Sequence, residues 1–492
     1  MYGNALILIA VLLALGTWKL LRIGRRDPRL PPGPPTVPIL GNAHQIPLTG
    51  LGKKFREWAK EYGNIYSLKV FDSNMIVLAD RRAIYQLLDK KGSVYSGRPH
   101  LSVPLFMSRG CHMTFEQATP EWREKRSVIT RNLNPQNLDT KHFRVQEAES
   151  ILFMNNLLQH PSRSFDHARL YASSVAAILV WGFRAKDFNS FFYKNFYDFV
   201  DQWLDAIEPG ANPPVEQLPW LWYLPGAWKR RAYRVRSLMD TTWSQARQQV
   251  DERRARGDIR DSMMDQKLSE YEKGGWPMSQ YSFNNLGGEM LEAGADTTAN
   301  MLLTIILAVT KFPEVQMKAR KELDEVCGTE RTPLFSDFER LPYINCIIKE
   351  ALRWRPTSDL GIPHRLEKDD WYEGMFFPKD TTVWLGAWAI HQNDDEYPDH
   401  DRFNPDRFKA GRRMCPGIHL AERSMWRVTA KLLWAFEFEE LPGRPIDVNA
   451  YTSSNLVRPL EYEVKVTPRS KQHEEVIKRE LTGALDFLSQ YD

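Results

Sequence analysis

The pattern of hydrophobic and polar residues favours helices over most of the chain. Apolar residues recur at helical spacing over Leu51–Tyr62 and Arg81–Lys90, and helical spacing also dominates from Gln117 to Thr310. Between the first two helices, Ile65–Leu78 alternates in the way that strands do. The pattern predicts a mainly α fold with a smaller β region.

The N-terminus has the pattern of a membrane anchor. Residues Met1–Trp18 carry no charged side chain, and a helix of that length rises roughly 27 Å, close to the thickness of the hydrocarbon core. Lys and Arg cluster directly after it, so the positive-inside rule places the rest of the chain in the cytoplasm. A cleaved secretory signal is the alternative, but its charges would precede the apolar run. The expected location is the endoplasmic reticulum membrane, crossed once.

The remaining pattern divides the chain into four parts. We expect a transmembrane anchor at 1–21, a basic and Pro-rich linker at 22–40, one catalytic domain at 41–468 and a polar tail at 469–492. A Pro- and Trp-rich stretch interrupts the helices at Pro213–Arg231. Its aromatic and basic residues suit either a membrane interface or a buried connecting loop.

Composition narrows the class of protein. The 492 residues carry a formal charge of +4 and a pI of about 8.6, which is too mild for a nucleic-acid binder but compatible with a membrane surface or an acidic partner. Four widely spaced cysteines do not make a disulfide framework, so each is buried filler, a thiol or a metal ligand.

One loop has the residues of a metal–thiolate site. It reads Phe-Lys-Ala-Gly-Arg-Arg-Met-Cys-Pro-Gly from Phe408 onward. A bound metal lowers the pKa of a thiol, so Cys415 can serve as an iron ligand. Gly411 and Gly417 permit tight turns that bring N–H groups toward the sulfur, and Arg413 offers a fork for an anionic group. A buried cysteine without a metal is the alternative, and His419 is a weaker candidate ligand.

A second motif lies inside a long helical stretch from about Tyr281 to Phe312. It reads Ala-Gly-Ala-Asp-Thr-Thr and places Asp296 and Thr297 side by side. Gly294 weakens the helix locally, and the Thr297 hydroxyl with the Asp296 carboxyl can deliver protons to a ligand. The alternative is an ordinary helix interior with a solvated Asp.

Taken together, these motifs resemble the cytochrome P450 family. The loop around Cys415 is similar to the family's cysteine signature, and residues 293–298 are similar to its oxygen-binding helix. The resemblance covers roughly residues 31–468 and is best to fungal-type microsomal enzymes. It implies the cytochrome P450 fold, with haem b (iron protoporphyrin IX) between the long central helix and the cysteine loop, and Cys415 as the iron ligand.

The resemblance also assigns further residues. The Glu-x-x-Arg pair Glu350 and Arg353, with Arg407 from a downstream loop, matches a cluster that holds the fold together. The residues assigned to haem contacts are Trp122, Arg126, His364, Phe408, Gly411, Arg413 and Gly417.

The chain departs from the family at one place. The family has a longer meander between the segment that contains Arg407 and the cysteine loop, whereas here only six residues lie between Phe408 and Cys415. Extended chain from Arg407 to Cys415 covers at most about 27 Å, so part of the wall on the thiolate side of the haem is expected to be missing.

The resemblance implies a monooxygenase that inserts one oxygen atom of O₂ into a small apolar or aromatic substrate, in secondary metabolism. Because the chain has no nucleotide or flavin motif, electrons are expected from an NADPH-cytochrome P450 reductase-type flavoprotein on the same membrane. The basic residues considered for docking it are Arg123, Lys125, Arg131, Arg412 and Arg423. The alternatives are a haem-thiolate isomerase or dehydratase, and a truncated membrane protein that fails to hold haem.

Overall fold

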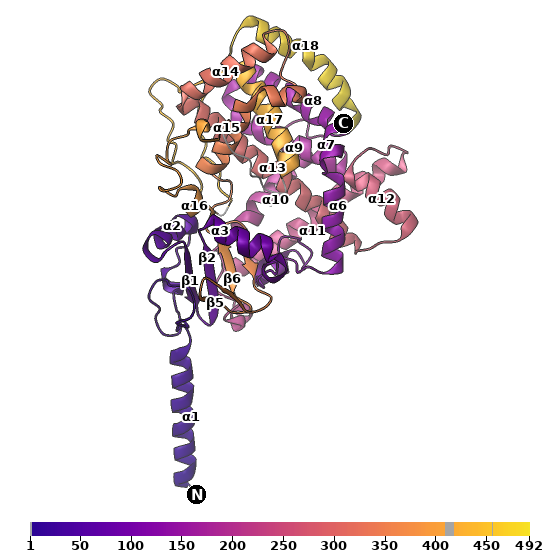
Figure 1. Cartoon of the computed structure of the whole chain (residues 1–492). Helices are drawn as coiled ribbons and strands as arrows, with labels where there is room; N and C mark the ends of the chain where they lie inside the picture. Colours follow the sequence, from indigo (N-terminus) through magenta and orange to yellow (C-terminus); the bar gives the residue numbers. More distant parts are fainter. Residues whose placement is uncertain (1, 409–417, 455) are drawn as a thin grey trace.

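The computed structural model describes residues 2–408, 418–454 and 456–492, and helices make up most of it (Figure 1). The longer helices are α1 (Tyr2–Arg22), α2 (Leu51–Tyr62), α6 (Pro120–Asn132), α8 (Phe143–Gln159), α9 (Ser164–Trp181), α10 (Phe191–Ile207), α11 (Ala227–Ala255), α12 (Met263–Gly274), α13 (Gln280–Lys311), α14 (Pro313–Cys327), α15 (Pro342–Trp354), α17 (Ile418–Ala435) and α18 (Lys471–Leu488). The shorter ones are α3 (Arg81–Ile84), α4 (Gly92–Tyr95), α5 (Ser102–Met107), α7 (Pro135–Thr140) and α16 (Ala387–His391), with single turns η1 (Ala43–Gln45), η2 (Tyr85–Lys90), η3 (Pro161–Arg163), η4 (Pro219–Tyr223), η5 (Phe335–Arg340), η6 (Pro405–Phe408) and η7 (Ser489–Tyr491).

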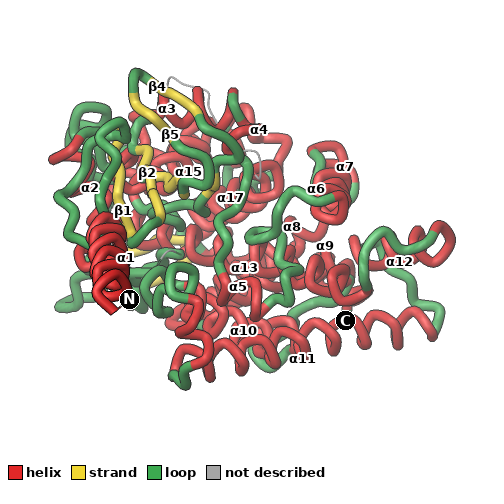
Figure 2. Tube along the Cα trace, turned by 90° about the horizontal axis from the view of Figure 1, so that it is seen from below, coloured by secondary structure: helices red, strands yellow, loops and turns green. Residues whose placement is uncertain are grey.

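The strands form one sheet of four and two ribbons of two. The larger sheet has the order β1-β2-β6-β3, in which β2 and β6 run parallel and the other neighbours run antiparallel. The ribbons pair β4 with β5 and β7 with β8. Figure 2 shows β1, β2, β4 and β5 gathered near α1, with α6, α7 and α12 at the far side of the body. The strands are β1 (Ile65–Val70), β2 (Ser73–Leu78), β3 (His364–Arg365), β4 (Asp370–Tyr372), β5 (Met375–Phe377), β6 (Thr382–Leu385), β7 (Phe436–Glu439) and β8 (Lys465–Pro468).

The core is built around α13, which runs through the middle of the helical body. It packs closely along α9, and α9 packs in turn on α8. The side chain of Ser279 caps the start of α13 by accepting from the Ser282 N–H. The helix ends at Lys311 because Pro313 opens α14, and proline disfavours a helical residue before it. These contacts agree with the predicted mainly α fold and the long central helix.

Among the described residues, α13 is the one helix that has the length and composition of a membrane span. It is mostly buried inside the protein, which is how a core helix behaves. The apolar part of α1 that can be assessed, Ile9–Lys19, is shorter. In Figure 1, α1 nevertheless projects away from the body as a separate helix.

The segment 469–492, expected as a polar tail, is instead a packed helix. Ser470 caps α18 by accepting from the His473 N–H, and α18 lies along α8. Val476, Ile477 and Leu488 are buried in the main core. The apolar residues of α18 form only a narrow stripe among many charged residues, and this stripe becomes a buried face because α8 packs against it.

The Pro- and Trp-rich stretch forms η4 and the start of α11. Trp220 and Tyr223 are 56% and 87% exposed, so this part of the stretch is not a buried loop. Trp222 is turned inward and stacks on Trp228 with ring centroids 4.9 Å apart. The buried-loop alternative therefore does not hold for Trp220 and Tyr223, and the membrane interface stays a prediction.

Candidate functional site

One stripe of α13 is accessible although the helix crosses the interior. Leu291, Ala295, Asp296, Ala299 and Asn300 are buried. Between residues 290 and 298, Glu292 is partly accessible, and the other accessible residues are Met290, Ala293, Gly294, Thr297 and Thr298. They recur at intervals of three and four residues and therefore share one side of the helix. We call this set the α13 stripe, and it marks where a ligand can contact the centre of the protein.

Thr297 and Asp296 lie next to each other at this stripe but differ in environment. The hydroxyl of Thr297 donates to the carbonyl of Ala293, one turn earlier, at 2.7 Å. Asp296 is buried, and its Oδ2 accepts from Asn300 Nδ2 at 2.9 Å. Its Oδ1 has no hydrogen-bond partner among the described residues. A buried carboxylate oxygen without a donor is costly, so this atom is suited to holding a proton or a hydrogen-bonding ligand.

Charged residues from three other elements surround Asp296. Burial raises the pKa of its carboxyl, and Arg169 and Arg458 partly offset that rise. Both guanidinium groups bind Asp201 Oδ1, at 3.3 Å and 3.1 Å, and Asp201 is partly exposed. Sequence reasoning missed Arg169, Asp201 and Arg458, because α9, α10 and the C-terminal segment are distant along the chain and no spacing connects them to Asp296.

The cationic side chain of Arg98 lies beside His364, and neither has an acidic partner among the described residues. Arg98 Nη1 donates to the carbonyl of Pro363 at 2.8 Å, and burial lowers the pKa of its guanidinium. Burial and the charge of Arg98 lower the pKa of His364, whose Nδ1 donates to the carbonyl of Tyr95 at 2.8 Å. Arg98 was also missed, because no motif in the sequence connects it to His364. A buried cation of this kind suits an anionic ligand.

Trp122 and Arg126 lie on α6, which Thr119 caps. The indole N–H of Trp122 donates to the carbonyl of Met113 at 3.1 Å, and the Arg126 guanidinium lies 5.4 Å from the Trp122 ring. Arg126 is exposed, and no carboxylate among the described residues pairs with it. It therefore remains available to an anion, whereas the Trp122 N–H is already bound.

One residue considered for partner docking is wrong. Lys125 is fully buried, and its Nζ donates to the carbonyl of Cys111 at 2.9 Å and pairs with Glu116. Its position on α6 points it into the protein, because the outward positions are those of Arg123 and Arg126. Arg423 is bound to Asp139. Arg123 and Arg131 remain exposed.

Glu350, Arg353 and Arg407 meet beneath α15. Arg353 forms a bidentate pair with Glu350, with Nε–Oε2 of 2.7 Å and Nη2–Oε1 of 2.8 Å, and both side chains are buried. Arg353 also donates to the carbonyls of His391 and His400. Arg407 Nε lies 3.6 Å from Glu350 Oε1, which is a looser contact. The cluster thus connects α15 to the segment that leads into η6.

Several expected site residues lie outside the described residues: Gly411, Arg413, Cys415 and Gly417. The described chain stops at Phe408, which packs against the main core at the end of η6, and resumes at Ile418 with α17. Of the other cysteines, Cys327 and Cys346 are buried in the main core.

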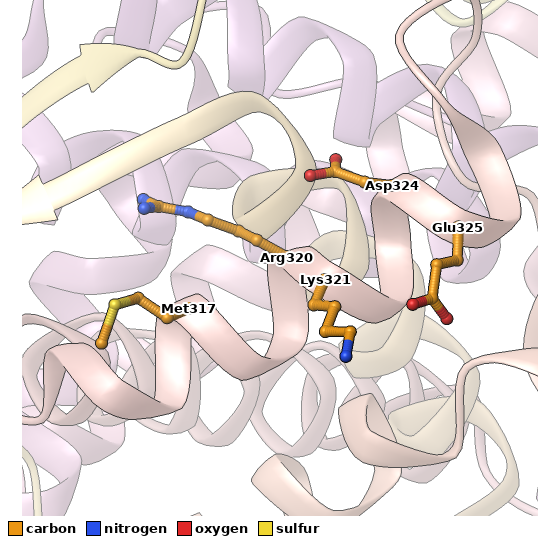
Figure 3. A pocket seen from close by; sticks show the side chains of 5 residues that line it. All are labelled: Met317, Arg320, Lys321, Asp324 and Glu325. Atoms are coloured by element: carbon orange, nitrogen blue, oxygen red, sulfur yellow. The ribbon is translucent and has the colours of Figure 1, made fainter.

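A surface hollow away from the stripe lies on α14 (Figure 3). Its five lining side chains project in different directions rather than converging. Arg320 is paired with Glu437 at 3.1 Å, and Asp324 is paired with Arg469 at 2.7 Å. These charges are already neutralised on the surface, so this hollow has no features of an active site.

The residues around the α13 stripe fit a haem. A haem needs an apolar face on the distal side and cationic groups near its two propionates. The stripe supplies Ala293, Gly294 and Thr297, and Arg98 and Arg126 are cations without acidic partners among the described residues.

Comparisons with known proteins agree with this arrangement. The family described as Cytochrome P450 matches residues 31–466. The chain is 38% identical to cytochrome P450 monooxygenase atE of Aspergillus terreus, covering 99% of this chain and 96% of that protein. It is 39% identical to cytochrome P450 monooxygenase patI of Aspergillus clavatus, covering 96% and 95%. It is 37% identical to cytochrome P450 monooxygenase yanC of Aspergillus niger, covering 99% and 97%.

A solved structure shares the fold. It is a zebra fish cytochrome P450 with abiraterone, which superposes with a TM-score of 0.70 at 22% identity and covers 85% of this chain and 100% of that one. The alignments with atE and yanC extend over 519 and 529 residues, more than the 492 of this chain. These relatives therefore contain residues that have no counterpart here.

Proposed function

The chain belongs to the cytochrome P450 family and is a monooxygenase, and from that premise we propose that it hydroxylates a small apolar or aromatic molecule in secondary metabolism. Membership in the family implies a haem-thiolate cofactor. When bound, haem supplies the activation of O₂ at its iron. One oxygen atom enters a C–H bond of the substrate, and the other leaves as water with two electrons and two protons.

We assign haem b to the space between α13 and the loop that contains Cys415. In this proposal Cys415 supplies the thiolate, and Gly411, Arg413, Gly417 and Phe408 surround it. Arg98, Arg126 and His364 would bind the propionates, which is supported by their lack of acidic partners among the described residues. Because Nδ1 of His364 already donates to Tyr95, only Nε2 is available to the propionate.

Asp296 and Thr297 are proposed to deliver protons to the distal side of the haem. Asp296 holds a proton readily because burial raises the pKa of its carboxyl. Asp201, partly exposed and bound to Arg169 and Arg458, connects this carboxyl to solvent. Thr297 can pass a proton through its hydroxyl once that hydroxyl leaves the Ala293 carbonyl. Asp296 and Thr297 thus act in sequence between solvent and substrate.

Electrons are proposed to come from an NADPH-dependent flavoprotein reductase on the same membrane. Arg123 and Arg131, exposed on α6, are candidates to contact an acidic partner surface. The endoplasmic reticulum is the proposed location, with α1 as the single span and residues 41–468 in the cytoplasm. The projecting apolar helix and the basic residues after it support this orientation.

The observation that carries the proposal is the α13 stripe, where Thr297 is accessible at the centre of a buried helix beside Asp296. The test is the carbon monoxide difference spectrum of the reduced full-length protein. We expect a Soret band at the thiolate position, its loss in Cys415→Ser and its retention in Cys111→Ser. A folded protein without this band would instead support the truncated alternative that does not hold haem, which the short segment between Phe408 and Cys415 motivates.

A further inference from the structure

A buried histidine lies between two glutamates at the N-terminal half of α13. His112, from the loop between α5 and α6, has Nδ1 3.5 Å from Glu289 Oε2 and Nε2 3.4 Å from Glu292 Oε2. Glu289 Oε2 also accepts from the Met113 N–H at 2.8 Å. Trp203 of α10 stacks on the imidazole, with ring centroids 4.9 Å apart. Three elements therefore fix His112, Glu289 and Glu292, which we call the His–Glu cluster.

The cluster contains more acceptors than its own donors satisfy. Oε1 of Glu289 and Oε1 of Glu292 are buried and have no hydrogen-bond partner among the groups that the structure describes. The two side chains are only 8% and 10% exposed. Each unpaired carboxylate oxygen is expensive away from water, so a folded protein is expected to supply it with a donor.

The cluster adjoins the α13 stripe. Glu289 precedes Ala293 by one helical turn, and Glu292 precedes Asp296 by one turn. Along the helix axis, Thr297 lies about 7.5 Å from Glu292 and about 12 Å from Glu289. These distances are close to the length of one aromatic ring with its substituents. Glu289 lies on the same side of the helix as Ala293, so a molecule anchored at Glu289 can extend along the stripe toward Thr297.

Charge decides which kind of donor fits. Burial raises the pKa of Glu289 to about 7. Burial lowers the pKa of His112, but Glu289 and Glu292 more than offset this, so that it is raised overall. Lys125, which is buried, and Glu116, whose pKa burial raises, are the other charged groups on the side of α6. The positive charge of His112 partly offsets the two carboxylates, and Lys125, although paired with Glu116, adds a positive charge nearby, so a neutral donor fits better than an ammonium group.

We propose that the His–Glu cluster is a specificity site that binds a hydroxyl group of the substrate, through a hydrogen bond to Glu289 Oε1 or Glu292 Oε1. The inference rests on the proposed function, since it places the substrate between this cluster and Thr297. The substrate is then an aromatic or apolar molecule that already carries a hydroxyl about one ring length from the carbon to be oxidised. The reaction that supplies it must leave such a hydroxyl in place.

The test compares two ligands of similar shape that differ in the donor. Binding of 4-ethylphenol and of 4-ethylanisole to the haem-loaded full-length protein is measured by calorimetric titration and by the shift of the Soret band. A hydrogen bond to a charged acceptor raises the binding affinity by about ten- to hundred-fold. We expect 4-ethylphenol to bind more tightly by at least about ten-fold. Equal affinities in the unmodified protein would overturn the proposal without any variant.

Variants then assign the preference to the cluster. Glu289→Gln and Glu292→Gln keep the side-chain shape and remove the carboxylate, and we expect the preference to fall below about three-fold in at least one of them. Glu314→Gln, exposed on α14, is the matched control and should keep the full preference. A preference that survives in both cluster variants assigns the hydroxyl to another site and overturns the proposal.

The spectrum separates this proposal from the proposed function. The carbon monoxide difference spectrum is recorded first on the same preparation. A missing thiolate band contradicts the proposed function, whereas a normal band with no preference for 4-ethylphenol contradicts only the hydroxyl site. Near-ultraviolet circular dichroism of each variant confirms that the tertiary packing is intact.

Discussion

The hydroxyl of Thr297 has two alternative hydrogen-bond partners, a carbonyl of its own helix and a ligand at the α13 stripe. In the structure it donates to the Ala293 carbonyl at 2.7 Å, a bond within its own helix. Losing this bond costs little free energy, because the Ala293 carbonyl also accepts a backbone N–H. A Thr in this position can therefore turn toward a ligand at the α13 stripe without a large loss of stability.

Replacing Thr297 by Ala should separate electron use from product formation. The hydroxyl that passes a proton is lost, so O₂ is reduced without oxygen transfer and leaves as peroxide. We expect the peroxide released per NADPH oxidised to rise several-fold in Thr297→Ala, while haem content stays unchanged. Thr297→Ser keeps the hydroxyl and should behave like the unmodified protein. Unchanged coupling in Thr297→Ala would remove Thr297 from proton delivery.

Asp359 should make the stability of the protein depend on pH. Burial raises its pKa to about 7, and Lys53 and Arg355 only partly offset this. The unfolded chain releases this proton near the ordinary value of 3.8, whereas the folded protein keeps it until about pH 7. Its contribution to the free energy of unfolding is therefore largest below pH 4 and is lost as the pH rises toward 7.

The variant Asp359→Asn cannot ionise and should escape this loss. We expect it to be more stable than the unmodified protein at pH 8, by on the order of 3 kcal/mol, and the difference should shrink steadily toward pH 5. Thermal unfolding across this range measures it. Asp198→Asn, at an exposed position of α10, is the control and should show no trend. A difference that does not change with pH would show that Asp359 ionises normally.

At the scale of elements, Glu350 connects α15 to the chain that approaches the haem. Its carboxylate accepts from Arg353 and from the Asn404 N–H at 2.8 Å, and Arg407 lies 3.6 Å away. Removing Glu350 leaves Arg353 charged, buried and without its carboxylate, which costs about 3–5 kcal/mol. Removing Arg407 costs less, because its contact is longer and Arg353 still neutralises Glu350.

We therefore expect a clear ranking of two variants. Glu350→Gln should lower the melting temperature strongly and release haem, whereas Arg407→Gln should lower it only slightly. The haem content of purified protein and thermal unfolding measure both effects. Equal losses from the two variants would show that the contact between Arg407 and Glu350 is as important as the buried bidentate pair.

Elements whose apolar faces meet the core directly could be predicted from the sequence. The helix over Leu51–Tyr62 has the bounds that its spacing predicts, and Ile65–Leu78 forms β1 and β2. The helix α18 could not be predicted, because its stripe of Val476, Ile477 and Leu488 is narrow and becomes a buried face only against α8.

The site residues also divide into those that the sequence could place together and those that it could not. Residues that share one helix, such as Asp296 with Thr297 and Glu350 with Arg353, could be placed together from spacing alone. Arg169 could not be connected to Asp296, since it lies on α9 and only the packing of α9 on α13 brings the two charges together. Lys125 is expected at the surface because lysine is nearly always exposed. It is buried instead because its amine bonds to the Cys111 carbonyl and to Glu116.

At the scale of the whole molecule, the C-terminal end of α1 and the exposed aromatic residues of η4 lie at the same end of the body. Ile39 N–H donates to the Ile23 carbonyl just after α1, and Gly41 pairs with Val70 at the end of β1. The neighbouring Ser73, at the start of β2, accepts from Gln217, which precedes η4. Contacts therefore lead step by step from the anchor to η4.

This arrangement predicts that the body touches the membrane independently of α1. A protein that lacks residues 1–22 should still bind vesicles with anionic headgroups, because Trp220 and Tyr223 enter the interface while the exposed Arg230 approaches the phosphates. Replacing Trp220 and Tyr223 together by Ser should weaken vesicle binding by at least about ten-fold in a sedimentation assay.

The matched control is Ile259→Ser. Ile259 is 61% exposed and lies in the connection between α11 and α12. Figure 1 shows α12 at the flank of the body, away from the end from which α1 projects, so this apolar side chain does not share the surface proposed for η4. If Ile259→Ser weakened binding as much as the double replacement, general apolar exposure would explain the attachment. If neither change affected it, the basic residues alone would hold the body at the surface, and binding should then disappear at high salt.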